Sequence, residues 1–176
     1  MLDTFTWIPE LIGRLHPMLV HIPIGLLVGA LLLEGWSWWK KDNSLQRGIH
    51  AMVWLGAASM LLALLAGLLL ADRGDYGGET LQWHRNGGIV TALLALLTVA
   101  LIRRKAALRW YRLALLACVV SLTLTGHQGA SLTHGADYLA SAFAPEAEKT
   151  PETAAMLASL RQSGSFLSEF LTWADD

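Results

Sequence analysis

Long runs of apolar residues, separated by short polar stretches, dominate the chain. Four such runs cover residues 18–35, 51–71, 88–102 and 113–125. Each run is apolar on all sides rather than along one stripe, which is typical of a helix that faces lipid. About 20 helical residues are needed to cross a hydrocarbon core of ~30 Å. The pattern therefore predicts four transmembrane helices rather than a soluble domain.

The two C-terminal runs are short for this purpose. The run 88–102 spans only about 22 Å at the helical rise of 1.5 Å per residue, so its helix must include flanking residues. The fold class that follows is all-α, an integral membrane four-helix bundle. The helices are expected at residues 17–38, 50–71, 83–102 and 110–129.

The rest of the chain divides around this bundle. Residues 1–14 form an amphipathic lead-in that is expected to lie on the membrane surface. The four-helix domain covers 15–139, and 140–176 form a periplasmic linker and a short helical tail, with Pro151 in a first helical turn and Gly164 beyond the end. Charged residues make up 15% of the chain, below the roughly 25% of soluble domains. The net charge of −1 gives no indication of a nucleic-acid partner.

Charge is distributed unevenly over the connecting loops. Loop 39–49 holds three basic residues and one acid, and stretch 103–112 holds five basic residues and no acid, whereas loop 72–82 holds three acids and one basic residue. Short loops rich in Lys and Arg stay cytoplasmic. The pattern predicts a multi-pass protein of the bacterial inner membrane with both termini in the periplasm. Glu34, inside the first apolar run, is expected to extend toward the interface or to pair with a loop arginine.

Histidine is the residue type that points to a bound group. Five of the six histidines map to the outer ends of the first, third and fourth helices, and only His50 maps to the inner side. Polar side chains are costly in hydrocarbon, so imidazoles there need a partner. His21 and His127, which lie deeper and beside helix breakers, are the first candidates for ligation. The outer-end histidines are His16, His21, His84, His127 and His134.

One chemistry that fits these imidazoles is axial ligation of b-type heme, as one or two hemes, for electron transfer. His16 and His21 are five residues apart and therefore about 140° apart around a helix. They would not face one iron together, which favours two sites, or one ligand with a hydrogen-bonding neighbour. Arg14 and Arg85 lie at a level where they can pair with heme propionates.

Two other interpretations stay open. The same imidazoles can hold zinc or copper, with Asp137 or Asp75 as a carboxylate ligand, although no His-x-x-x-His spacing supports this. Alternatively, the histidines are structural, and the chain is a non-catalytic subunit that anchors a membrane complex. Cys118 is the only cysteine, so neither a disulfide nor a Cys-x-x-Cys-His heme attachment is expected. No Ser-His-Asp arrangement or phosphate loop indicates an enzyme.

Three segments carry a resemblance to a known family. They read LHPMLVHIPIG at 15–25, LQWHRNGGIVTA at 81–92 and GHQGASLTHGADYL at 126–139. Over about 15–139 the chain resembles the bacterial four-helix membrane domain known as domain of unknown function 2231. The resemblance implies that the five outer-end histidines are functional positions, that the domain binds heme, and that it belongs to an electron-transfer chain.

Relatives of this kind often carry a c-type cytochrome module, but this sequence has no c-type heme motif after Leu139. The resemblance therefore implies a separate periplasmic c-type cytochrome or a respiratory complex as partner, with the lipid bilayer around the helices. The function predicted from the sequence is that of a membrane-embedded, cytochrome b-like electron-transfer protein rather than a stand-alone enzyme. Whether a quinone binds is left open.

Overall fold

The structure is a computed structural model that describes residues 7–73, 77–135, 137–143, 151–152, 155–156 and 158–160. Helices are the regular elements of these described residues, and no strand occurs among them, so the predicted all-α class is confirmed. The chain divides into two compact units, Met1–Thr133 and His134–Asp176. The elements are α1 (Trp7–Arg14), α2 (His16–Leu19), α3 (His21–Lys40), α4 (Gln46–Arg73), α5 (Gly78–Arg103), α6 (Leu108–His134) and the short 3-10 helix η2 (Ala140–Phe143).

Four segments are long and apolar enough to cross a membrane. They have 25 to 27 residues each, more than the about 20 that a hydrocarbon core requires. Only 22–33% of the most apolar window in each is buried inside the protein, so most of the apolar side chains face outward, where lipid can cover them. The predicted four-helix membrane bundle is confirmed. The spans are His16–Lys40, Gln46–Asp72, Gly78–Arg103 and Leu108–His134.

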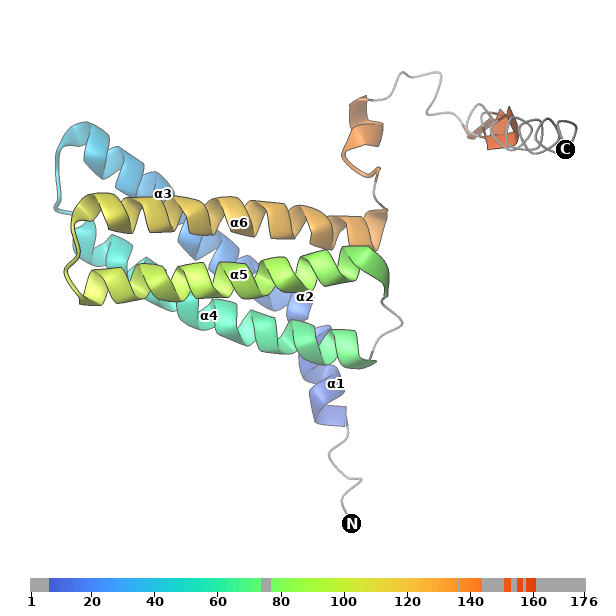
Figure 1. Cartoon of the computed structure of the whole chain (residues 1–176), viewed down its shortest axis with the longest axis horizontal. Coiled ribbons are helices and arrows are strands. Elements are labelled where there is room, and N and C mark those ends of the chain that lie inside the picture. The colour runs from blue at the N-terminus through green and yellow to red at the C-terminus, as the bar shows by residue number, and fades with distance from the viewer. Residues whose placement is uncertain are drawn as a thin grey trace, which may run out of the picture. The chain divides into compact units, whose positions relative to one another are not determined.

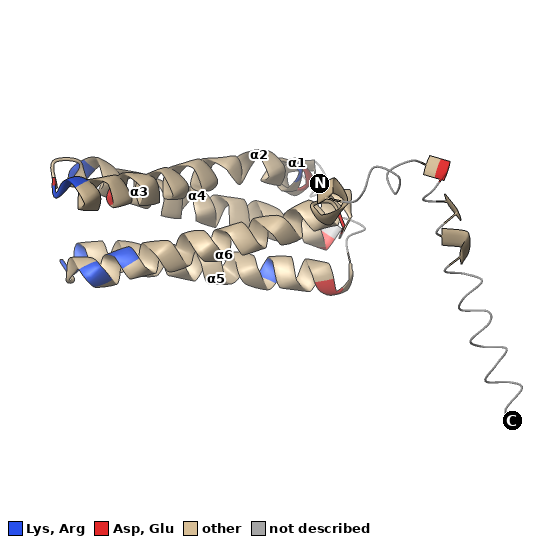
Figure 2. Cartoon of the chain, turned by 90° about the horizontal axis from the view of Figure 1, so that it is seen from above, with Lys and Arg blue, Asp and Glu red and all other residues tan. Residues whose placement is uncertain are grey.

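The long helices form two antiparallel hairpins, α3–α4 and α5–α6, that lie in two layers (Figures 1 and 2). The α3–α4 and α5–α6 turns lie at the same end of the bundle, on the left in Figure 1. We call this end the inner end and the opposite one the outer end, after the sides that the sequence predicts.

Small residues allow the helices to approach closely. Alanines from every long helix are fully or almost fully buried, among them Ala30, Ala57 and Ala95, and Gly56 of α4 leaves room for the side chain of Leu27. Small residues are the usual means by which membrane helices pack, since lipid chains are as apolar as leucine and provide no hydrophobic drive between helices. The buried Thr91 adds a hydrogen bond of 2.8 Å to Ser121 between α5 and α6.

All four spans are longer than the sequence predicted, and α5 and α6 differ most at their outer ends. Helix α5 begins at Gly78 rather than at 83, so His84 lies in its second turn. Helix α6 continues through Gly126 and Gly129 and stops only at Gly135, whose φ of +92° ends the helix. The outer ends of α5 and α6 were predicted wrongly from the apolar runs, because these ends are polar and still helical. The predicted tail that starts at Pro151 is helical at 151–152, 155–156 and 158–160, and the rest of it lies outside the described residues.

The first predicted helix is interrupted near Val20, which separates α2 from α3. Pro23 has no N–H to donate to the carbonyl of Leu19, one turn earlier, so the backbone ladder lacks a hydrogen bond at this point. Val20 keeps helical backbone angles, and His16–Lys40 still forms one continuous span. The sequence predicted this span without its break.

The lead-in, for which the sequence predicted a position on the membrane surface, forms α1 and packs against the outer half of α4. Gly13 makes the close approach, because a Cβ atom there would lie 2.9 Å from the backbone nitrogen of Leu70. This contact fixes the chain immediately before His16.

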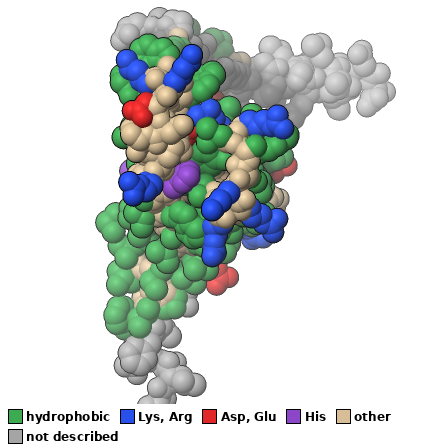
Figure 3. All heavy atoms as spheres, turned by 90° about the vertical axis from the view of Figure 1, so that its left-hand side faces the viewer, with side chains coloured by type: hydrophobic (Ala, Val, Ile, Leu, Met, Phe, Trp, Pro, Cys, Tyr) green, Lys and Arg blue, Asp and Glu red, His purple; other side chains and the backbone are tan. Residues whose placement is uncertain are grey.

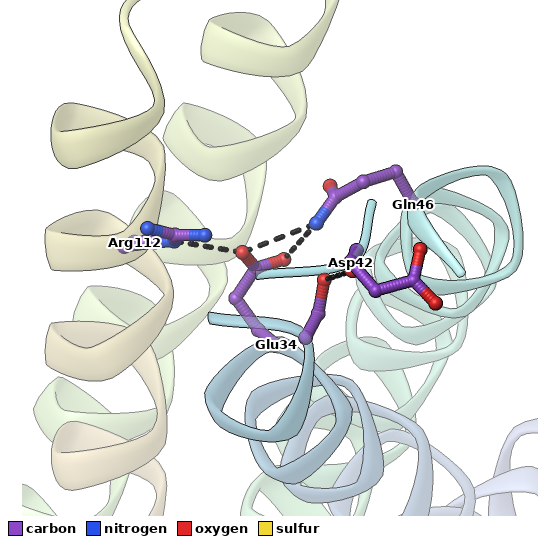
Figure 4. A network of polar contacts seen from close by, with 5 residues as sticks. Glu34, Asp42, Gln46 and Arg112 are labelled. Atoms are coloured by element: carbon purple, nitrogen blue, oxygen red, sulfur yellow. Dashed lines mark hydrogen bonds and ion pairs between the residues drawn. The ribbon is translucent and has the colours of Figure 1, made fainter. Parts of the chain in front are cut away.

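Glu34 is 2% exposed and forms the polar centre of the inner end. Its carboxylate accepts a 2.8 Å hydrogen bond from Nε of Arg112 on α6, and bonds of 3.0 and 3.2 Å from Nε2 of Gln46 at the start of α4 (Figure 4). Of the two outcomes expected for Glu34, pairing with an arginine is confirmed. Together with Gln46, the pair joins three of the four long helices.

The mutation Glu34→Ala is expected to reduce the free energy of unfolding by about 3 kcal/mol, because it leaves the partly buried Arg112 without its countercharge. Denaturation of the purified protein in mixed micelles measures this. Glu10→Ala is the matched control, since the Glu10–Arg14 pair is exposed and its removal should cost less than about 1 kcal/mol. Equal losses in the two variants would contradict a special role for the inner pair.

Candidate functional site: a pair of anchored imidazoles

The half-buried imidazole of His16 lies at the start of α2 and reaches across to α4. Its Nδ1 lies 2.8 Å from the carbonyl oxygen of Ala63. A carbonyl oxygen only accepts hydrogen bonds, so Nδ1 carries the proton. The ring rests on Gly67, where a Cβ atom would lie 2.8 Å from the ring carbon Cε1.

His84, in the second turn of α5, repeats this arrangement against α6. Its Nδ1 lies 3.0 Å from the carbonyl oxygen of Thr125. The ring rests on Gly129, where a Cβ atom would come within 2.9 Å of the ring carbon Cε1. In both cases the accepting carbonyl is four residues before the glycine, so the missing side chain lies directly beside the acceptor.

The two hydrogen bonds determine which imidazole nitrogen can ligate. With Nδ1–H committed to a backbone carbonyl, the lone pair of a neutral imidazole is on Nε2. Histidines that bind metals almost always donate their other ring N–H to a carbonyl or carboxylate in this manner. His16 and His84 therefore have the tautomer and the support that ligation requires.

The two rings also lie close to one another. Their centroids are 6.1 Å apart and their planes meet at 81°. Two imidazoles that bind one metal from opposite sides, each with a metal–nitrogen bond of about 2.0 Å, have centroids about 6 Å apart. These two side chains come from segments 68 positions apart in the sequence, and the bundle alone brings them together.

The other two histidines proposed as metal ligands lie elsewhere on the outer half. His21 is exposed, and its Nδ1 bonds to the carbonyl of Pro17 at 2.6 Å, within its own turn. This agrees with the large angle between His16 and His21 around the helix axis. His127 is also exposed. The structure places neither ring in the His16–His84 pair.

The last two histidines each contact a tyrosine ring. His134 belongs to the second compact unit and stacks on Tyr138 with centroids 4.6 Å apart. His50 contacts Tyr111 edge to face at the inner half, with centroids 5.4 Å apart.

The four charged residues proposed as partners are accounted for as follows. Arg14 pairs with Glu10 at 2.6 Å on the surface of α1, and Arg85 is exposed on α5. Asp137 is in the second unit, and Asp75 lies outside the described residues. Across the described part of the chain, no three His, Cys, Asp or Glu side chains gather in a way that could hold a metal ion.

Four residues of the site were not singled out for this role by the sequence: Ala63, Gly67, Thr125 and Gly129. Ala63 and Thr125 act only through their backbone carbonyls, and any residue type has such a carbonyl. The two glycines, in contrast, can be recognised from the sequence. A glycine inside an apolar helix costs about 1 kcal/mol relative to alanine, which indicates close approach by a neighbour. Gly67 meets that description.

The fold and this pair define a class: a four-helix membrane protein with two anchored imidazoles from different helices at its outer end. The model of the DUF2231 family, described as predicted membrane proteins, matches residues 14–138. The chain belongs to this family. Its match covers the bundle and both imidazoles. No curated protein and no solved structure is detectably similar to the chain.

Replacing either supporting glycine by alanine is expected to displace an imidazole and lower the free energy of unfolding by about 1–3 kcal/mol, as overpacking does. Gly67→Ala acts on His16, and Gly129→Ala acts on His84. Gly48→Ala on α4 and Gly126→Ala on α6 are matched controls, because nothing lies within 4 Å of their added Cβ atoms. They should be neutral or stabilising by up to about 1 kcal/mol. Denaturation of all four variants checks this, and four equal effects would contradict it.

Proposed function

We propose that this protein is a membrane-embedded, cytochrome b-like electron-transfer component that binds one b-type heme through His16 and His84. The observation that carries the proposal is the pair of imidazoles with Nδ1 anchored to Ala63 and Thr125 and with centroids 6.1 Å apart. One anchored pair supports one heme. When bound, heme supplies a one-electron redox centre whose potential depends on its axial ligands.

The number of ligands favours heme over zinc. Structural zinc takes four protein ligands, and catalytic zinc takes three, whereas the described residues offer two imidazoles and no third group. In heme the macrocycle occupies four positions around the iron, and a protein needs to supply only two. Copper remains as an outcome of the test, because imidazole suits it.

Each residue of the site has a separate task in this proposal. His16 and His84 ligate through Nε2, and the carbonyls of Ala63 and Thr125 hold the rings in one orientation and raise their basicity. Gly67 and Gly129 leave space for the rings. Because α2 and α5 come from different hairpins, the bound group would also tie the two layers together.

The outer position of the pair supports an exchange of electrons on the side of the termini. We propose that this side is the periplasm of the bacterial inner membrane, with a c-type cytochrome or a respiratory complex as partner and a membrane donor such as a quinol. The uneven loop charges support this orientation, since most Lys and Arg residues lie at the inner end, where the ribbon is blue (Figure 2).

Protein purified in detergent from heme-replete cells is expected to show a Soret band at about one heme per chain. His16→Gly and His84→Gly should lose the band, and added imidazole should restore it by ligating in place of the deleted ring. His21→Gly and His127→Gly, which remove exposed rings, serve as controls and should keep it. Absorption spectra with iron and copper analysis measure the outcome. A colourless protein without metal would leave a structural role for the pair, and loss of the band only in the controls would identify other ligands.

The orientation of the protein in the membrane can be tested by labelling introduced cysteines. Cys118, the only native cysteine, is fully buried and should not react. A membrane-impermeant maleimide should label Glu79→Cys in intact spheroplasts, because this residue begins α5 at the outer end. It should label Lys105→Cys, in the α5–α6 turn, only after the membrane is permeabilised. The reverse pattern would contradict periplasmic termini.

A further inference from the structure

The inner end carries many cations that have no carboxylate partner. Its two acids are already engaged: Glu34 pairs with Arg112, and Asp42 accepts hydrogen bonds from the backbone N–H and the hydroxyl of Ser44 at 2.8 and 2.9 Å. These bonds hold the pKa of Asp42 below its usual value. Among the described residues, the ion pairs of this chain use none of the other inner-end cations. Those exposed cations are Lys40, Lys41, Arg47, Arg103, Arg104, Lys105 and Arg109.

The cations are densest at the α5–α6 turn. Arg103, Arg104, Lys105 and Arg109 lie within seven residues of sequence, and all four are exposed. Lys105 reverses the chain direction with a left-handed backbone, at φ 50°. Like charges held this close repel one another, so an anion placed among them is favourable. Figure 3, which faces the inner end, shows basic side chains gathered around hydrophobic ones.

Tryptophans fix these cations at a defined depth. The guanidinium of Arg103 lies 5.5 Å from the ring centroid of Trp54, and that of Arg109 lies 5.4 Å from that of Trp110. On the neighbouring turn, the ammonium of Lys40 lies 4.7 Å from the ring of Trp39. Exposed tryptophans at helix ends lie at the level of lipid headgroups. The contacts therefore hold Arg103, Arg109 and Lys40 near the level expected for lipid phosphates.

We propose that the α5–α6 turn, through Arg103, Arg104, Lys105 and Arg109, binds the headgroups of anionic phospholipids in the adjoining leaflet. The cations contact the phosphate, and Trp54 and Trp110 contact the glycerol and upper acyl region of the same molecule. A free phosphate ion would use only the first of these contacts. The surface therefore selects an amphipathic anion, and this selection does not depend on heme binding.

The test uses quenching of tryptophan fluorescence by brominated lipid. The purified full-length protein is placed in vesicles that contain phosphatidylglycerol and phosphatidylcholine, with bromine on the acyl chains of one or the other at equal mole fraction. Brominated phosphatidylglycerol is expected to quench more strongly. Each Lys or Arg beside an anionic surface is worth about fivefold in affinity. The combined variant Arg103→Gln, Arg104→Gln, Lys105→Gln should therefore lower the relative affinity for phosphatidylglycerol at least about fivefold.

The control variant Arg14→Gln, Arg85→Gln removes two cations from the outer end and should keep the preference. Inorganic phosphate should fail to reverse it in the unaltered protein, whereas reversal would identify a free-anion site and overturn the proposal. If the triple variant does not fold, quenching of the unaltered protein in 1 M salt replaces it. Salt at this concentration reduces the screening length to about 3 Å and should abolish the preference for phosphatidylglycerol. Equal quenching by both lipids in the unaltered protein, or an unchanged preference in the triple variant, would overturn the proposal.

Discussion

A hydrogen bond from an imidazole to a helix carbonyl, formed beside a glycine, is the interaction on which the outer end of this protein depends. Inside an apolar bundle an imidazole N–H must find an acceptor, because neither lipid nor leucine provides one. The carbonyls of Ala63 and Thr125 already belong to helices, yet each can accept a second bond because Gly67 or Gly129 leaves space for the ring. The same arrangement occurs at His16 and at His84, and in both the Nδ1 atom is engaged while Nε2 is left for another group.

At the inner end, the buried polar group is a carboxylate, and a charged partner satisfies it. Glu34 is buried, but Arg112 and Gln46 satisfy it, and so α3, α4 and α6 are held together where their turns begin. Residues 16 and 34 are separated by about 27 Å along a helix at 1.5 Å per residue, a distance filled by alanines and leucines. The two ends are therefore too far apart to act on one another directly. The redox group proposed for the outer end and the lipid proposed for the inner end should therefore be separable by mutation.

The histidines show how far sequence reasoning reaches and where it stops. Their position at one end of the helices, and the angle that separates His16 from His21, follow from spacing along a helix and were predicted. Which histidines face one another depends on the rotation of each helix about its axis. That rotation is set by contacts such as Gly56 with Leu27, which no local pattern reveals. His21 and His127 lie deeper in the sequence pattern, but their helices turn them outward.

The sequence by itself determined that four helices cross a membrane, which ends carry the positive charges, and that Glu34 needs a partner, because these depend on composition and on the cost of polar groups in hydrocarbon. Only the tertiary structure decided where the polar outer ends of α5 and α6 begin and end, that α1 packs on α4 through Gly13, and that His16 meets His84. The reason is that burial in lipid constrains whole segments, whereas contact between two side chains requires the close packing of residues far apart in the chain.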